Sequence, residues 1–422
     1  MHCSAPAADQ ACGPSRSAAL DGVRALAIVA VLAFHADYGW ASGGYLGVDV
    51  FFVLSGYLIT RVLLSTHRSW WGYRQFLVRR AVRLFPALVV AMTGASVVGL
   101  LVGVPAGQVG RCGGAAVAYV MNLPPAGDWD CPAIWHVTWS LAAEQQFYLV
   151  WPLVLAALGV VMARWRPSTG RGRGRGLRVA AVVCLVAYGL GLVRQVVGTL
   201  QGELTNGELE FSPDGRSLVL LLGCALALLA ASRRAASRPG TVRRADVAAL
   251  PALGVLAWCF AVGDIGLGLG DRWALPVAGA ASMALVAALV HAPERSVAKR
   301  LLGARPVAWL GRVSYSLYLW HEVAYRVAEA FGQRGALHIE VLRFALSLAL
   351  AAASYRWVEQ PAQRWWRRRG EQVEPESSEQ QVSGFAAAAA ATGPTPSSRI
   401  PHQPLSPLRP AAEQPSTPAA RR

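Results

Sequence analysis

Long runs of apolar residues, broken at intervals by short polar segments, fill the chain up to residue 369. A transmembrane helix needs about 20 predominantly apolar residues. Ten runs come close enough to that length to predict ten membrane-spanning helices, and an eleventh run, 113–122, is too short to cross unaided. The ten runs are 23–38, 45–64, 84–104, 139–163, 179–198, 216–231, 246–263, 273–292, 309–331 and 339–356.

The basic residues between the runs predict the orientation of these helices. Alternate intervening segments hold 24 Lys and Arg in total, whereas the other segments hold 2. Because basic loops stay in the cytoplasm, both termini are expected inside, and the run 113–122 is expected to form a half-helix or re-entrant piece on the outer side. Backbone of that kind must be covered by protein. The basic segments are 65–81, 164–178, 232–245, 293–306 and 356–369.

Composition supports a membrane protein. Hydrophobic residues make up 54% of the 422 positions and charged residues 15%, where an average globular chain has about 25% charged residues. The net charge of +16 is concentrated in the predicted cytoplasmic segments, so it indicates contact with anionic lipid more than binding to nucleic acid. We therefore predict an all-α, polytopic integral membrane protein of about ten transmembrane helices, with the lipid bilayer and no nucleic acid as a partner.

Three regions are predicted along the chain. Residues 1–19 are expected to form an N-terminal cytoplasmic tail, followed by a membrane domain over residues 20–369. Residues 370–422 are rich in Ala, Pro, Ser and Gln, which predicts a disordered cytoplasmic tail. No cleavage site follows the first apolar run, so this run is expected to be a retained span and not a signal peptide.

The first run carries three ionisable side chains, which are costly inside a membrane and by default mark function. Arg24 and His35 are 11 residues apart, which places them within about 20° of alignment on a helix and about 16 Å apart along its axis. Asp21 lies about 40° from His35, on the side away from Arg24. One stripe is therefore expected to hold a carboxylate and a guanidinium at the cytoplasmic end and an imidazole near the outer end. A simple hydrogen bond between helices is the alternative role of the imidazole, and the shared face with Arg24 makes this alternative less favoured.

The fourth run begins with polar side chains at helical spacing. Ser140, Glu144 and Tyr148 follow each other at intervals of four, so they line one face of a helix. Glu144 is a candidate for orienting a catalytic group, and equally for a structural pair with an arginine. Asp49 lies near the outer edge of the second run. It suits a structural role, as a cap or in an ion pair, as well as a role in a functional site.

The ninth run places Ser314, Tyr318 and His321 at i, i+4 and i+7, again on one face. Aromatic residues at this spacing often belong only to the core, but His321 followed by Glu322 in mid-span points to a function. The last run ends with Glu359, which is expected at the inner membrane interface.

Three arginines, Arg79, Arg80 and Arg83, are expected at a helix start beside the cytoplasmic face. Guanidinium forks bind phosphates through paired hydrogen bonds, so these residues are candidates for holding a phosphorylated ligand. Anchoring of a basic loop inside the cell is the alternative, and spacing alone does not separate the two.

The seven cysteines form no CxxC pair and show no metal-ligand spacing, so no metal site is predicted. Cys112 and Cys131 both fall in the outer segment 105–134, where the medium is oxidising and paired thiols tend to form disulfides. A bridge there would stabilise the fold by about 3 kcal/mol and pin the short run 113–122. It requires Cα atoms within about 7 Å of each other, a distance that the sequence does not fix.

Six of these segments, taken together, resemble acyltransferase family 3, a family of integral-membrane acyltransferases. They occur in the family's order and cover about residues 18–366. One departure is Val323, which stands where the family usually has a proline two residues after the histidine, and a local change in helix shape is expected there. The six segments are 21–35, 44–60, 79–86, 139–148, 314–321 and 358–361.

The resemblance implies transfer of an acyl group, expected to be acetyl, from cytoplasmic acyl-coenzyme A to a hydroxyl group. The acceptor is usually a sugar, on a cell-envelope glycan, a glycolipid or a secondary metabolite. The resemblance also implies that His35 is essential, that Arg24 supports it, and that Arg80 and Arg83 help to hold the donor, with Arg79 beside them. Acyl-coenzyme A is then a co-substrate, and no tightly bound cofactor is expected.

The role of the histidine stays open at this point. His35 suits a general base because imidazole titrates in the right range, and a covalent acyl-histidine is the alternative. Either Glu144 or Asp21 is expected to orient a ring or a guanidinium. A transporter or flippase that uses His35, Glu144 and Glu322 as a proton relay is a different class, although no inverted repeat is evident. A catalytically inactive membrane scaffold is a third.

Overall fold

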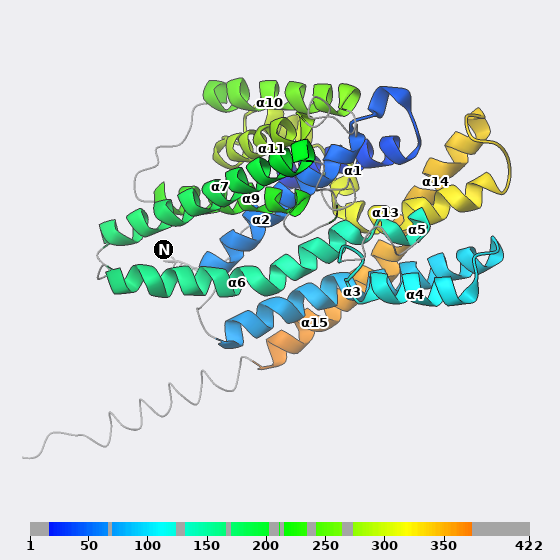
Figure 1. The fold of residues 1–422 in the computed structure, drawn as a ribbon, viewed down its shortest axis with the longest axis horizontal. Helices are drawn as coiled ribbons and strands as arrows, with labels where there is room; N and C mark the ends of the chain where they lie inside the picture. Colours follow the sequence, from blue (N-terminus) through cyan, green and yellow to red (C-terminus); the bar gives the residue numbers. More distant parts are fainter. Residues whose placement is uncertain are drawn as a thin grey trace, which may run out of the picture. The chain divides into compact units, whose positions relative to one another are not determined.

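Each of the ten apolar runs lies in a helix of the computed structural model (Figure 1). The structure describes residues 17–65, 70–123, 131–165, 170–201, 211, 215–233, 242–263 and 273–373, and it contains no strand among them. The longer helices are α1 (Ala18–His35), α2 (Gly47–Ser65), α3 (Trp70–Leu101), α4 (Ala106–Val117), α6 (Trp139–Trp165), α7 (Gly170–Gln201), α9 (Leu220–Arg233), α10 (Val242–Val262), α11 (Ala274–His291), α13 (Arg305–Glu329), α14 (Leu337–Ser354) and α15 (Gln360–Val373). The short elements are η1 (Gly39–Ala41), η2 (Gly44–Leu46), α5 (Ala133–His136), η3 (Arg216–Val219), α12 (Val297–Leu302) and the π-helical turn η4 (Tyr355–Glu359).

The prediction of an all-α polytopic membrane protein is confirmed. Seven helical segments among the described residues are long and apolar enough to cross a membrane, and two shorter apolar segments occupy 216–232 and 246–262. Helix α13 is 25 residues long, but its polar side chains, among them His321 and Glu322, lower its hydropathy. The count of ten crossings, the inside position of both termini and the three predicted regions stay predictions, and residues 1–16 and 374–422 lie outside the described residues.

Helix α1 packs backbone against backbone on the end of α12 and on α13, and one glycine at each contact makes this possible. A Cβ added at Gly22 would lie 2.0 Å from the carbonyl oxygen of Leu302, and one added at Gly311 would lie 1.7 Å from the carbonyl oxygen of Asp21. Small residues let helices in a membrane approach this closely. The close approach brings the polar stripe of α1 directly against α13.

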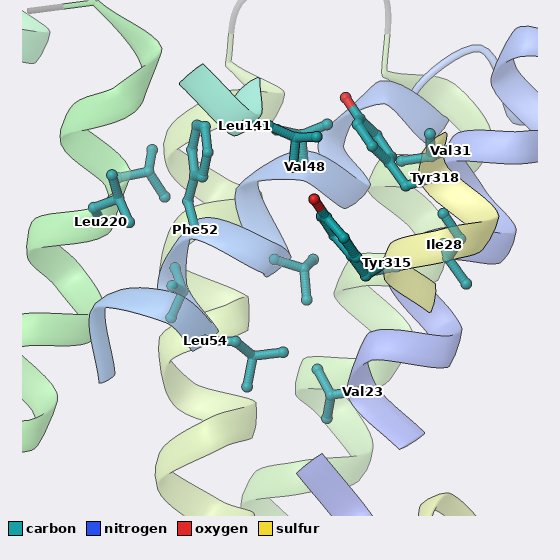
Figure 2. Close-up of a cluster of buried hydrophobic side chains, with 14 of the residues drawn as sticks. Val23, Ile28, Val31, Val48, Phe52, Leu54, Leu141, Leu220, Tyr315 and Tyr318 are labelled. Atoms are coloured by element: carbon teal, nitrogen blue, oxygen red, sulfur yellow. The ribbon is translucent and has the colours of Figure 1, made fainter. Parts of the chain in front are cut away.

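A buried apolar cluster surrounds the contact between α1, α2 and α13. Figure 2 shows Ile28 and Val31 of α1 beside α13, and it shows Tyr315 and Tyr318 projecting from α13 toward Val48 of α2. All five side chains are buried. Because Tyr315 and Tyr318 each carry a hydroxyl, they bring polar atoms into an otherwise apolar region.

Helix α2 is fixed to the segment before α9 by a buried ion pair. Asp49 is fully buried, and Arg216 donates to both of its carboxylate oxygens, at 2.5 to 3.2 Å. The same guanidinium lies over the rings of Tyr45 and Trp139. Asp49 therefore has the structural role that was one of its two predicted roles.

The short run 113–122 is a helix only over its first part, because α4 ends at Val117. This helix has 12 residues, which gives about 18 Å of length and is too short to cross a bilayer. It packs against α3, and Cys112 at its centre is bonded to Cys131 with a Cα–Cα distance of 5.8 Å. The predicted disulfide is confirmed, and so is the expectation that protein covers this segment, since the side chains of Ala115, Ala116 and Met121 are buried.

Labelling of the denatured protein is expected to detect this bridge. In protein denatured without reductant, Cys112 and Cys131 should not react with a maleimide, and both should react after reduction. The buried free thiols Cys184, Cys224 and Cys259 are internal controls and should react in both samples. Mass spectrometry of the peptides is the measurement, and labelling of Cys112 before reduction would contradict the bridge.

Candidate active site

Four helices, α1, α2, α6 and α13, line a pocket with a cavity volume of about 50 Å³. Its walls carry one cation, Arg24, and one carboxylate, Glu144, among apolar and hydroxyl side chains. Ionisable groups that face one cavity inside a membrane domain mark a functional site. The other lining residues are Val48, Phe51, Phe52, Ser55, Ser140, Leu141, Ser314, Tyr315 and Tyr318.

The predicted stripe on α1 faces α13 along its whole length. Arg24 Nε donates to Ser314 Oγ at 3.3 Å, and the guanidinium lies 5.8 Å from the centroid of the Phe51 ring. At the other end of the stripe, His35 lies against His321. The carbonyl of Asp21 contacts Gly311, so all three predicted residues of α1 are placed against α13, with Asp21 in the helix contact and outside the pocket lining.

Glu144 accepts hydrogen bonds from the hydroxyl groups of Ser55 and Tyr148. These two hydroxyl groups lie on α2 and α6, and the alternative of a structural pair with an arginine stays a prediction. The predicted shared face of Ser140, Glu144 and Tyr148 is confirmed. Arg80 lies over the Tyr148 ring, with 4.7 Å from its guanidinium carbon to the ring centroid, and so joins this group from α3.

Two tyrosines of α13 tie the pocket walls together. The hydroxyl of Tyr318 lies 2.7 Å from Ser140 Oγ and donates to the carbonyl of Val137, also at 2.7 Å. The hydroxyl of Tyr315 donates to the carbonyl of Leu84 on α3 at 2.9 Å. The predicted face of Ser314, Tyr318 and His321 is thus turned toward the pocket and toward α1. With Val323 in place of proline, α13 continues as an α-helix to Glu329.

Two histidines, one on α1 and one on α13, meet beside this pocket. The ring centroids of His35 and His321 are 4.9 Å apart. His35 Nδ1 is 2.9 Å from the carbonyl oxygen of Val31, and His321 Nδ1 is 2.7 Å from that of Tyr318. Because a carbonyl only accepts, each ring donates its Nδ1–H, and each neutral ring carries its free lone pair on Nε2.

A carboxylate completes this cluster, since Glu322 Oε1 lies 3.7 Å from His321 Nε2. One nitrogen of each histidine and one oxygen of Glu322 lie within 4.8 Å of one another, and no other group of three such side chains with metal-ligand spacing is found among the described residues. The expectation of no metal site rested on the spacing of the cysteines, and it stays a prediction at this cluster.

Two residues that hold the His35 end of α1 in place were missed from the sequence. The hydroxyl of Tyr325 donates to the carbonyl of Leu32 at 3.0 Å, and Arg343 donates to the carbonyl of His35 at 3.3 Å. Arg343 is fully buried on α14, with its guanidinium 4.1 Å from the Tyr325 ring centroid. The Leu32 carbonyl also accepts from the N–H of Ala36, whereas the His35 carbonyl is one of the last carbonyls of α1, which have no partner inside the helix. The signal was available, since Arg343 is an ionisable residue within the run 339–356.

A network of hydrogen bonds continues from Arg343 to the loop after α1. Glu340 accepts from Arg343 at 3.1 Å and from the hydroxyl of Tyr38 at 3.0 Å. Burial, with a smaller effect from the hydrogen bond to Glu340, raises the pKa of Tyr38 above its usual range. The phenol therefore stays protonated at neutral pH and keeps this bond between the loop after α1 and helix α14.

The three arginines of α3 lie further into the helix than predicted. Helix α3 begins at Trp70, so Arg79 to Arg83 lie about 14 to 20 Å from its first residue and not at a helix start, because the polar segment before them is already helical. Arg79 is exposed and donates to Gln75 at 3.4 Å, and Arg80 and Arg83 are half-buried.

Glu359 lies in the π-helical turn η4. Its side chain is 2% exposed and accepts a hydrogen bond from Ser316 of α13, so the carboxylate points into the protein. Its predicted position at the level of the inner membrane interface stays a prediction. Such π-helical turns inside α-helices are frequent at functional sites.

The family model for an acyltransferase domain, Acyl_transf_3, matches residues 17–356, nearly the whole described membrane region. The chain belongs to acyltransferase family 3. It is 31% identical over 358 residues to YrhL of Bacillus subtilis, a match that covers 81% of this chain and 54% of the relative.

Two further relatives give the same picture. The chain is 30% identical over 374 residues to the O-acetyltransferase OatA of Staphylococcus aureus, covering 82% of this chain and 57% of OatA. It is 29% identical over 366 residues to the peptidoglycan O-acetyltransferase OatA of Listeria monocytogenes, covering 82% and 55%. The chain thus spans about half the length of the curated relatives it matches. No solved structure matches it.

The six segments that resemble acyltransferase family 3 are far apart in the sequence but neighbours in the structure. Segments of α1, α2, α6 and α13 contribute the pocket walls, Arg80 of α3 contacts Tyr148, and Glu359 accepts from Ser316 of α13. The family resemblance and the polar cluster therefore coincide at one place in the fold.

Proposed function

We propose that this protein transfers an acetyl group from acyl-coenzyme A, supplied on the cytoplasmic side, to a hydroxyl group of a sugar on the outer side of the membrane. The observation that carries the proposal is the continuous series of polar side chains inside the membrane domain. It runs from Arg80 through Tyr148 and Glu144 to the pocket, and from Arg24 over Ser314, Tyr318 and His321 of α13 to His35. The family membership and the O-acetyltransferase relatives support the same reaction class.

The donor end of the site is proposed at the arginines of α3. Coenzyme A is anionic and cannot enter hydrocarbon, so its phosphates would bind Arg79, Arg80 and Arg83 while its long arm extends toward the pocket. Guanidinium groups suit phosphates because they form paired hydrogen bonds. Along α1, the distance from Arg24 to His35 is about 16 Å, so a long, thin arm suits this route better than a compact donor.

The acyl transfer itself is proposed at His35. The acceptor hydroxyl loses its proton to Nε2 of His35 as its oxygen bonds to the acyl carbon, the carbon–sulfur bond breaks, and the proton passes to the departing thiolate. The hydrogen bond from Nδ1 to Val31 supports this role, because it leaves the basic lone pair on Nε2. A covalent acyl-histidine formed by the same nitrogen is the alternative.

The acceptor is proposed to be a sugar hydroxyl, and peptidoglycan is the first acceptor to test because the OatA of Listeria monocytogenes is named for it. A glycolipid and a secondary-metabolite sugar are the other acceptors of this class. Comparing the base-labile acetate released from cell walls and metabolites of cells with and without the gene identifies which one is modified.

A thioester-consumption assay tests the reaction. The purified full-length chain, reconstituted in lipid, should release free coenzyme A from acetyl-coenzyme A only when a sugar acceptor is present. A transporter or flippase would leave the thioester intact under these conditions, and that result would overturn the proposed function.

Substitution of the α3 arginines is expected to weaken donor binding. Arg80→Ala and Arg83→Ala should raise the KM for acetyl-coenzyme A about tenfold, because each removes a phosphate contact, while the KM for the acceptor changes little. Arg74→Ala is the matched control, since Arg74 is exposed on the same helix and stacks on Trp71. If the KM for the acceptor alone rose, the donor site would lie elsewhere.

A further inference from the structure

One buried nitrogen beside His35 has no hydrogen-bond partner: Nε2 of His321. The His321 side chain is fully buried, and its Nδ1 donates to the carbonyl of Tyr318. Among the described residues, Nε2 belongs to a small set of buried side-chain nitrogens and oxygens that form no hydrogen bond. Buried polar atoms nearly always have a partner, so an unpartnered one at a candidate site indicates a donor that appears only during function.

None of the fixed groups around this nitrogen supplies the missing donor. The hydroxyl groups of Tyr318 and Tyr325 already donate to the carbonyls of Val137 and Leu32. Glu322, at 3.7 Å, only accepts when it is ionised. Neutral His35 cannot donate through Nε2 either, because its one ring proton is on Nδ1, which donates to the carbonyl of Val31.

His35 becomes a donor as soon as it takes up a second proton. Protonation at Nε2 gives His35 a second N–H. The acceptor for it is the lone pair on Nε2 of the fully buried His321. One nitrogen of each histidine lies in the cluster whose atoms are within 4.8 Å of one another. His35 is only half-buried, so its ring has room to turn. Catalytic hydrogen bonds are often long before substrate binds and tighten afterwards.

We propose that His321 is a positioning residue that accepts a hydrogen bond from protonated His35 during acyl transfer. This inference rests on the proposed function, in which His35 takes the proton of the acceptor hydroxyl. His321 neither gains nor loses a proton: the proton moves from the hydroxyl to His35 and then to the thiolate, while His321 holds the imidazolium in place. The nearby Glu322 carboxylate favours the same positive charge.

Three substitutions of His321 separate this role from packing. His321→Gln places an accepting amide oxygen near the position of Nε2. His321→Asn keeps only a donor near the position of Nδ1, and His321→Leu keeps only the volume. In the reconstituted full-length protein, Asn and Leu should lower kcat about 100-fold with both KM values unchanged, and Gln should retain activity within about tenfold of the wild type.

The outcomes that overturn the proposal are distinct. Equal loss in the Gln, Asn and Leu variants would indicate a structural role, and gel filtration with thermal unfolding shows whether each variant folds. A raised KM for the acceptor would make His321 an acceptor-binding residue. The cluster would be a metal site if the wild type contained stoichiometric metal, the His321 variants had lost that metal, and chelation abolished the activity of the wild type.

Failure of the proposed function is distinguishable from failure of this inference. If the wild type consumes no thioester, or if His35→Ala is fully active, the proposed function fails and the inference fails with it. If His35→Ala is inactive while all three His321 variants keep wild-type kcat, the function stands and the inference alone is wrong.

Discussion

Replacing His35 with alanine is expected to lower acyl-transfer turnover by about 10²–10⁴-fold, the usual contribution of a general base. The variant removes a half-buried imidazole that lies against His321. Folding should be little affected, because Arg343 and Tyr325 bind backbone carbonyls of α1 and not the imidazole. Coenzyme A release from acetyl-coenzyme A is the measurement.

His291→Ala is the matched control for this experiment. His291 also ends a helix and bonds through Nδ1 to the carbonyl four residues earlier, at 2.8 Å from Ala287, but it is exposed and does not line the pocket. It should keep wild-type turnover. If His35→Ala retained a tenth of the wild-type turnover or more, its catalytic assignment would be wrong.

Removing Arg216 is expected to destabilise the protein by about 3–5 kcal/mol, because Asp49 would be left as an unpaired charge in the interior. Asp49 is 0% exposed and Arg216 is 4% exposed, so water cannot replace the lost contact. The Arg216→Leu variant should show this loss in the free energy of unfolding, measured by denaturant titration in mixed micelles.

Two further variants test the physical reason. The double variant, Asp49→Leu with Arg216→Leu, should recover most of the lost stability, because replacing both members of a buried pair by apolar residues is often neutral. Arg334→Ala removes a guanidinium that is 47% exposed from its pair with Asp37, and should cost less than about 1 kcal/mol. If Arg216→Leu and Arg334→Ala lowered the free energy of unfolding by similar amounts, breaking the buried pair would cost no more than breaking an exposed one, and the explanation would be wrong.

Much of the site was predictable because a helix has a fixed period. The spacing of Arg24 and His35 predicted one shared face, and both side chains do face α13. The same holds for Ser314, Tyr318 and His321 on α13. Which residues share a face is a local property, set by 3.6 residues per turn, so it needs no knowledge of the neighbours.

Partners across helices were not predictable in the same way. Glu144 bonds to two hydroxyl groups where an arginine was considered, and Asp49 finds its arginine at position 216, far along the chain. Periodicity says nothing about which helix lies opposite. Glu359 points inward because of one π-helical turn, a local irregularity without a sequence pattern that we recognised.

The sequence by itself determined the class of the protein, because apolar length and the absence of strand patterns leave few ways to satisfy the backbone in lipid. The sequence also determined where the apolar helices lie, which side chains of α1 share one face, and to which family the chain belongs. Only the tertiary structure decided that His35 meets His321, because that contact depends on how closely α1 and α13 approach. Gly311 permits this approach, because a side chain there would collide with the carbonyl of Asp21. The consequence is a contact between residues almost three hundred positions apart.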